Sequence, residues 1–178
     1  NSFEENPFSL KPNYPQIYQD IPEIQRVQQV AHKAALMKVE EEVEGVLMKG
    51  VSGDFDTLGF QEYLVEGRFI SIPETGTSNE IVISRFLANR LLLEVGDRIL
   101  LYFFQDPPRY RRVEVVGIYE TFLENFDQKI IIGELQTIRN LNGWNEDQVG
   151  GLEIFLEGQP SPELTRTIEE VLELDLKL

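Results

Sequence analysis

Residues 79–119, NEIVISRFLANRLLLEVGDRILLYFFQDPPRYRRVEVVGIY, are the stretch that decides the fold. The stretch opens with a short apolar run, which is typical of a buried strand, and continues into apolar residues at helical spacing up to Leu91. After a turn at Gly96, two β-like runs at 98–104 and 112–119 flank a tip that contains two prolines. The stretch therefore predicts a strand, a helix and a β-hairpin, in that order.

On the N-terminal side, residues 1–24 contain four prolines among aromatic residues and predict an extended arm packed by its aromatics. The apolar spacing of residues 26–39 fits both a helix and a strand. The β-like run at 43–51 and the acidic turn before it favour a long hairpin. Residues 71–78, which include a proline and a glycine, predict a surface loop and the best internal boundary.

On the C-terminal side, residues 129–132 predict a short buried strand, and residues 134–141 predict a helix that a following glycine stops. Residues 148–156 predict a strand with a bulge at its two glycines. Ser161-Pro162-Glu163 begins a last helix, because it offers a capping hydroxyl, a proline and an acid. With so few crossover helices, the order of elements predicts an α+β fold.

Composition restricts the class of protein. The 178 residues carry a net charge of −15, which argues against nucleic acid as a partner and against docking on an anionic membrane surface. The absence of cysteine excludes disulfides and thiolate metal sites. No run approaches the roughly 20 apolar residues of a membrane span, and no signal peptide or initiator methionine is present. We therefore expect a soluble piece of a longer protein.

No set of residues predicts catalysis. His32 is the only histidine, so a histidine metal pair or a nucleophile–histidine–acid triad is excluded, and we interpret it as a strand-face residue. The acids of 40–44 lack the spacing of a calcium loop and fit a solvated turn. Glu66 and Asp97 are conceivable as a glycosidase pair, but nothing in the sequence brings them together. Trp144 is interpreted as a core residue. No cofactor or metal is predicted.

The hairpin tip differs from the rest of this acidic chain. Pro107 and Pro108 hold the loop in a preset conformation, because each fixes its own φ and restricts its predecessor. A basic and aromatic cluster lies beside them, made of Arg109, Tyr110, Arg111 and Arg112. Since arginine and tyrosine dominate interface hot spots and a rigid loop costs less to order, these six residues are the candidate partner-binding site. An alternative stays open, in which the prolines only end strand pairing and the arginines balance neighbouring acids.

Several motifs resemble one family of membrane transporters. The motifs are NEIVISRFLA (79–88), LEVGDR (93–98), EYLVEGRF (62–69), VVGIY (115–119), LNGW (141–144) and GGLEI (150–154). In this order and spacing they resemble the extracytoplasmic core of ABC transporter permeases of the MacB, FtsX and LolC–LolE group. The last two motifs are most similar to the lipoprotein-releasing branch.

The resemblance implies a two-part α+β fold, the MacB-like periplasmic core domain. Residues 1–67 and 148–178 would form a porter-like α/β sandwich part, and residues 68–147 an inserted, mostly-β, sabre-like part. The domain would lie on the periplasmic side of the inner membrane, between the first two spans of a four-span permease. In lipoprotein-releasing members a hook hairpin holds the carrier chaperone, and the matching position here is 104–112.

The resemblance also implies that this domain is not an enzyme, because ATP hydrolysis belongs to a cytoplasmic ATP-binding subunit. The further partners it implies are a second permease subunit, a periplasmic lipoprotein carrier or adaptor protein, and the lipoprotein substrate. Two other functions are kept as alternatives. One is a MacB-type export permease that works with a periplasmic adaptor, and the other is a free-standing periplasmic hydrolase that uses carboxylates.

Overall fold

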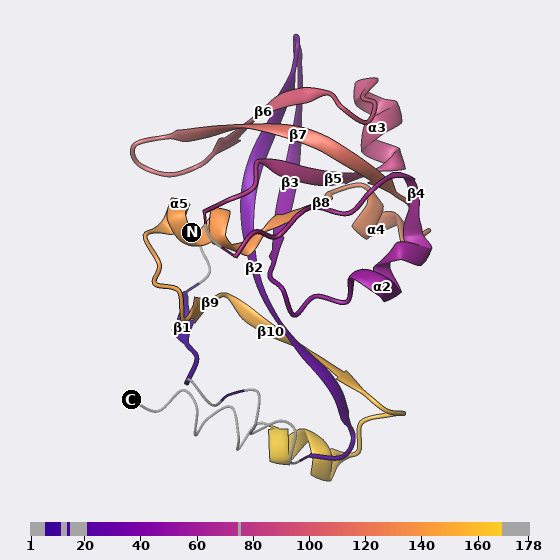
Figure 1. Cartoon of the computed structure of the whole chain (residues 1–178), viewed down its shortest axis with the longest axis vertical. Helices are drawn as coiled ribbons and strands as arrows, with labels where there is room; N and C mark the ends of the chain where they lie inside the picture. Colours follow the sequence, from indigo (N-terminus) through magenta and orange to yellow (C-terminus); the bar gives the residue numbers. More distant parts are fainter. Residues whose placement is uncertain (1–5, 12–13, 15–20, 75, 169–178) are drawn as a thin grey trace.

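The computed structural model describes residues 6–11, 14, 21–74 and 76–168 (Figure 1). In chain order the elements are β1 (Phe8–Ser9), β2 (Ile24–Val39), β3 (Glu42–Val51), α2 (Thr57–Phe60), the 3₁₀ helix η1 (Gln61–Tyr63), β4 (Leu64–Gly67), β5 (Glu80–Ser84), α3 (Arg85–Leu91), β6 (Arg98–Phe103), β7 (Arg109–Tyr119), α4 (Glu124–Asp127), β8 (Ile130–Glu134), α5 (Leu135–Asn142), β9 (Gln148–Val149) and β10 (Gly151–Leu156). Residues 162–168 are also helical. Within these ranges, none of the helices combines the length and the apolar character needed to cross a membrane.

Six strands pair in a closed ring at the centre of the fold. Each strand is hydrogen-bonded to the next in the order β2, β3, β8, β5, β7, β6, and β6 pairs with β2 again. The pairings of β3 with β8 and of β5 with β7 are parallel, and the others in the ring are antiparallel. A closed ring leaves no free edge between its own members and encloses its own core.

The interior of the ring is filled by every second residue of its strands, which is the period of a strand with one buried face. These side chains belong to one buried cluster and include Ala31, Ala35, Met37, Val46, Met48, Ile81, Ile83, Ile99, Leu101, Phe103, Val113, Val115 and Ile131. Lys33 lies in the same phase of β2 and is buried, and its Nζ donates to Asn142 Oδ1 at 2.5 Å. The hydrogen bond gives this core ammonium a polar partner at the end of α5.

Strand β2 links the ring to a strand outside it. It is 16 residues long, and its C-terminal part, Ala35–Lys38, pairs with β6 inside the ring. Its N-terminal part pairs with β10, which is an edge of the sheet. Figure 1 shows β2 running from the ring at the top of the view to β10 below it.

Two helices add apolar faces to the core of the ring. Helix α3 begins at Ser84, whose Oγ accepts a hydrogen bond from the Leu87 amide at 3.1 Å and caps the first turn. Helix α5 ends at Gly143, which has a φ of 70° and forms the left-handed cap that glycine favours. The buried side chains of both helices, such as Leu91 and Ile138, belong to the same cluster as the strand residues.

A second apolar cluster covers the outer face of four ring strands, β3, β5, β7 and β8. Val51, Val82 and Ile132 alternate with inward-facing residues and so point away from the ring. Tyr119 of β7 is fully buried in this cluster, and its hydroxyl donates to the Ile130 carbonyl at 2.8 Å. The phenylalanines that pack here are Phe55, Phe60, Phe69 and Phe126. They bring the segment around α2 and the short helix α4 against the ring.

The α+β class and most of the predicted elements are confirmed. The ambiguous segment 26–39 is a strand, and it forms the predicted hairpin with 43–51 through a turn at residues 40–41. The prediction of one bulged strand over 148–156 is wrong, because β9 ends at Val149, β10 begins at Gly151, and the two strands pair in different sheets. Short elements that the sequence analysis missed include β1, β4 and α4.

Two further predictions concern the N-terminal arm and the division of the chain into two parts. The extended arm is wrong at Tyr14, which is helical and whose amide donates to the Lys11 carbonyl at 2.9 Å. Much of the arm lies outside the described residues. The division into 1–67 with 148–178 and 68–147 stays a prediction. Strands from both parts are hydrogen-bonded into one sheet.

The pairing of β4 with β7 depends on a close backbone approach at Gly117, which lies opposite Gly67. A Cβ added at Gly117 would overlap the carbonyl oxygen of Arg68. We expect Gly117→Ala to lower the free energy of unfolding by about 1–3 kcal/mol, as overpacking of a closed structure does. The matched control is Gly45→Ala on β3, where nothing lies within 4 Å of the added atom. Equal effects in urea unfolding would contradict this account.

Glu80 ties the loop after β4 to the start of β5. Its carboxylate accepts from both Arg68 Nη atoms, at 2.8 and 2.6 Å, and from the Ser71 amide at 2.7 Å. The Arg68 guanidinium holds the pKa of Glu80 at about 2, below the ordinary 4.5. A lowered pKa in the folded state stabilises the protein above pH 4.5, and that contribution is lost as the pH falls towards 2.

We therefore expect the difference in unfolding free energy between the wild type and Glu80→Gln to be largest near neutral pH and to shrink between pH 4.5 and 2. Arg68→Gln removes the main cause of the shift, so in that background Glu80→Gln is expected to have little effect at any pH. Denaturant unfolding at a series of pH values measures both. A difference that is constant with pH would show that the Arg68 contact does not hold in solution.

Candidate functional site

The hairpin of β6 and β7 carries the candidate partner-binding residues. The two strands pair in a register that ends with Phe103 opposite Arg109, and residues 104–108 form the tip between them. Figure 1 shows this tip projecting sideways beyond the ring. Arg109 to Arg112 lie on β7 and not in the tip, because the strand begins three residues earlier than the predicted 112–119. The pairing with β6 fixes the backbone of these four residues and so determines the face of the hairpin on which each side chain lies.

Strand alternation divides the basic cluster between the two faces of the hairpin. Arg109 and Arg111 share the phase of the inward-facing Val113, so they lie on the side of α5. Tyr110 and Arg112 lie on the opposite, outer side. There the Tyr110 ring packs across the strands against Tyr102, with ring centroids 6.1 Å apart.

The end of α5 supports the tip of the hairpin. Gln105 Nε2 donates to the Leu141 carbonyl at 3.2 Å, and Arg109 Nη1 donates to the Asn140 carbonyl at 3.4 Å. The last carbonyls of a helix lack intrahelical donors and carry partial negative charge, so a guanidinium is favourable there. The contact therefore limits the freedom of the tip relative to the ring.

Most of the predicted site is exposed to solvent. Pro107, Pro108, Arg109 and Arg112 are exposed, Tyr110 is 64% exposed, and Arg111 is half-buried. The structure adds two aromatic residues that the sequence analysis did not select, Phe104 at 60% exposure and Tyr102 at 37%. For Tyr102 the strand pattern offered a clue, because it lies between Leu101 and Phe103, which are buried on the other face. Tyr102, Tyr110 and Arg112 share the outer side of the hairpin.

The other residues considered for chemistry have structural surroundings. Glu66 forms an ion pair with Arg85 at 3.2 Å, whereas Asp97 accepts from the Glu94 amide at 2.8 Å and so closes its own turn. His32 lies on β2, opposite Lys49. Trp144 packs against the core of the ring, as predicted. In the described ranges, no three acidic or histidine side chains gather where they would hold a metal ion.

Residues 4–171 match the MacB-like periplasmic core domain, and the chain belongs to this family. The chain is therefore an extracytoplasmic domain of an ABC transporter permease.

Two solved structures share the fold. One is the extracellular domain of the noncanonical ABC-type transporter YknZ from Gram-positive bacteria, with a TM-score of 0.64 and 15% identity, covering 98% of this chain and 88% of that one. The other is the periplasmic region of MacB from Actinobacillus actinomycetemcomitans, with a TM-score of 0.60 and 14% identity, covering 98% of this chain and 78% of that one. No curated protein matches the chain by sequence.

Proposed function

We propose that this domain belongs to a lipoprotein-releasing permease of the inner membrane and that its β6–β7 hairpin holds a periplasmic lipoprotein carrier. The observation that carries the proposal is the exposed, basic and aromatic hairpin in a chain whose total net charge is −15. Arginine and tyrosine are the residues that most often supply binding energy at protein interfaces. In this proposal the hairpin has the role that the hook has in the family's lipoprotein-releasing members.

The way the hairpin is built supports a role in force transmission. The β6 strand pairs with both β7 and β2, and the tip contacts the end of α5. A hairpin that is fixed to a closed ring moves with the ring as a rigid body. In this proposal, ATP turnover by a cytoplasmic subunit moves the permease and its second permease subunit, and the hairpin carries that motion to the carrier. The domain itself performs no chemistry.

A second function is favoured by one observation. The fold resembles the periplasmic region of MacB. An export permease that works with a periplasmic adaptor protein is therefore the other candidate. Both candidates use the domain as a protein-contact module, and they differ in the partner that the hairpin meets.

The experiment replaces Arg109 and Arg111 by glutamate and measures binding of the purified domain to the lipoprotein carrier of the same organism and, separately, to its adaptor protein. We expect the double variant to weaken carrier binding by at least tenfold, because two favourable charges become repulsive, while adaptor binding stays undetectable in both proteins. Biolayer interferometry at two salt concentrations measures the change, and the wild-type affinity should fall as salt rises.

The matched control is the pair Arg90→Glu and Lys129→Glu, which changes the net charge equally. Arg90 lies on α3 and Lys129 follows α4, and Figure 1 places both helices on the side of the ring away from the tip. Carrier binding that is lost equally in both double variants would mean that charge alone matters and would reject the hairpin. Binding to the adaptor instead of the carrier would favour the export function.

A further inference from the structure

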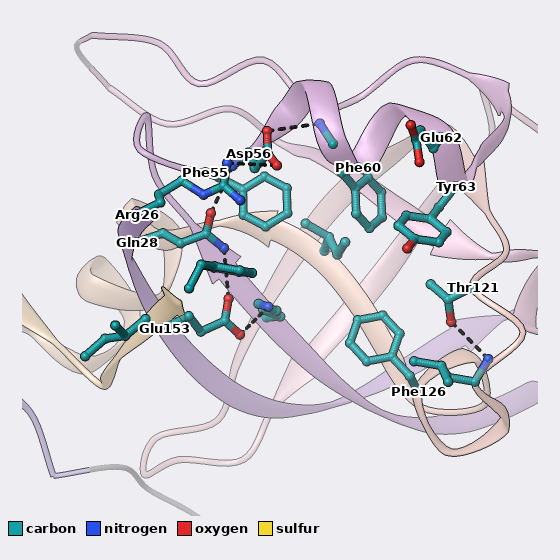
Figure 2. A pocket seen from close by; sticks show the side chains of 16 residues that line it. Arg26, Gln28, Phe55, Asp56, Phe60, Glu62, Tyr63, Thr121, Phe126 and Glu153 are labelled. Atoms are coloured by element: carbon teal, nitrogen blue, oxygen red, sulfur yellow. Dashed lines mark hydrogen bonds and ion pairs between the residues drawn. The ribbon is translucent and has the colours of Figure 1, made fainter. Parts of the chain in front are cut away.

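A second surface lies apart from the hairpin, where an open cavity of about 860 Å³ separates α2 and η1 from strands β2 and β10. Figure 2 shows the side chains that line it. The rings of Phe55, Phe60 and Tyr63 lie on one side, and Phe126 faces them from the other. Aromatic walls of this kind are typical of cavities that take an apolar group.

The aromatic walls are held rigidly before any ligand binds. Phe55 stacks on Phe69 with ring centroids 5.1 Å apart, and Phe60 meets the buried Tyr119 edge-on at 5.5 Å. Tyr119 also contacts Phe126, at 5.8 Å. Because one buried ring supports two of the walls, the cavity does not have to be ordered when it is filled, which lowers the cost of binding.

The opposite wall of the cavity is polar, and its charges are paired with one another. Arg26 Nη1 lies 2.8 Å from Asp56 Oδ2, and Lys49 Nζ lies 2.5 Å from Glu153 Oε1. Gln28 connects the two pairs, since it accepts from the Asp56 amide and donates to Glu153. This wall is therefore neutral as a whole. It has no charge left for an ionic ligand.

Two apolar side chains in the loop at the rim of the cavity, those of Phe122 and Leu123, are exposed to solvent. The buried carboxylate of Asp127 accepts from the Thr121 hydroxyl at 2.6 Å and from the Phe122 amide at 3.0 Å. The loop thereby holds Phe122 at a φ of 62°, a conformation that residues other than glycine seldom adopt. Phe122 is 84% exposed, and Leu123, which lines the cavity, is 65% exposed. A loop fixed in this conformation presents two apolar residues that make a contact surface.

One carboxylate at the rim of the cavity, that of Glu62, has no ion-pair partner in the described part of the chain. Glu62 lines the cavity and is exposed. The body around it is strongly acidic, with a net charge of −15. Charge complementarity therefore selects a basic partner. It disfavours both a second copy of this chain and an anionic lipid surface.

We propose that this cavity is a docking site for a partner protein, which inserts one aromatic or branched apolar side chain between Phe60 and Phe126 and places an adjacent basic residue near Glu62. Phe122 and Leu123 cover the inserted side chain from the rim. This surface is independent of the hairpin, and it gives the domain a second protein contact on a different side of the ring.

The test uses capped tripeptides as probes and the isotope-labelled domain as receptor, followed by NMR chemical-shift titration. The three probes carry a phenylalanine between two arginines, a phenylalanine between two glutamates, and a glycine between two arginines. We expect the first to shift the backbone amides of Phe55, Glu62 and Leu123. The second should bind at least tenfold more weakly because its charges are repelled, and the third should produce no shifts at these residues.

Two variants locate the contact. Glu62→Lys is expected to weaken binding of the first peptide about three- to fivefold, the size of an exposed ion pair. Its matched control is Glu41→Lys in the distant β2–β3 turn, which changes the charge equally and should leave the affinity unchanged. Leu123→Ser should weaken binding without altering the rest of the spectrum. The variant with Arg109 and Arg111 replaced by glutamate should bind like the wild type, which separates this proposal from the hairpin's function.

Several outcomes would overturn the proposal. These are equal binding of the basic and acidic peptides, shifts confined to residues 102–112, and an affinity that Glu62→Lys leaves unchanged. Broadening of the Phe122 and Leu123 signals by phosphatidylcholine vesicles, with no response to the peptides, would assign the rim to a lipid surface. Shifts at the same residues on raising the protein concentration alone would assign it to a second copy of the chain.

Discussion

The pairing of Ala35–Lys38 in β2 with Leu100–Phe103 in β6 closes the strand ring, and the rest of the structure depends on it. Without this pairing β6 would be an edge held only by β7, and both strands would present unpaired backbone groups to solvent. The inward-facing Ala35 and Met37 would lose their partners Leu101 and Phe103 in the core. Closure of the ring therefore satisfies the backbone groups of both strands and buries the core side chains between them. It also fixes β6, the first strand of the hairpin, to the ring.

Strand β2, which closes the ring, also reaches beyond it because of its length. A strand of 16 residues is long enough to pair with β6 at one end and β10 at the other while β3 follows most of its length. Arg26 and Gln28, near its beginning, line the aromatic cavity, and Ala35 to Lys38 support the hairpin. One continuous strand thus joins the two candidate contact surfaces. A twisted strand within a paired sheet bends little, so the two surfaces keep a fixed separation.

Local structure was predicted well where the spacing of apolar residues agreed with the glycines and prolines that end helices and strands. The β-like run at 98–104 indicated a strand, and the cap at Gly143 ended a helix where expected. Closure of the ring could not be predicted, because the β2–β6 and β3–β8 pairings join segments more than 60 residues apart in the chain and no local pattern encodes them. The position of the hairpin was predicted, but its outer face was not. The position of Tyr102 in the strand indicated that face, whereas its contact with Tyr110 depends on the cross-strand register.

The cavity was missed for a physical reason. Its walls come from six separated segments, and Phe55, Phe60 and Phe126 look in sequence like ordinary core residues. They are also core residues, since all three pack against the second apolar cluster, and Phe60 and Phe126 contact Tyr119 directly. Whether an aromatic side chain is a core residue or a cavity wall depends on what lies on its other face. Here that face looks onto two ion pairs, Arg26 of β2 with Asp56 before α2 and Lys49 of β3 with Glu153 of β10. A polar surface that satisfies its own charges neither repels an apolar group nor fills the space itself. For that reason the same aromatic residues that stabilise the fold also leave room for a partner's side chain.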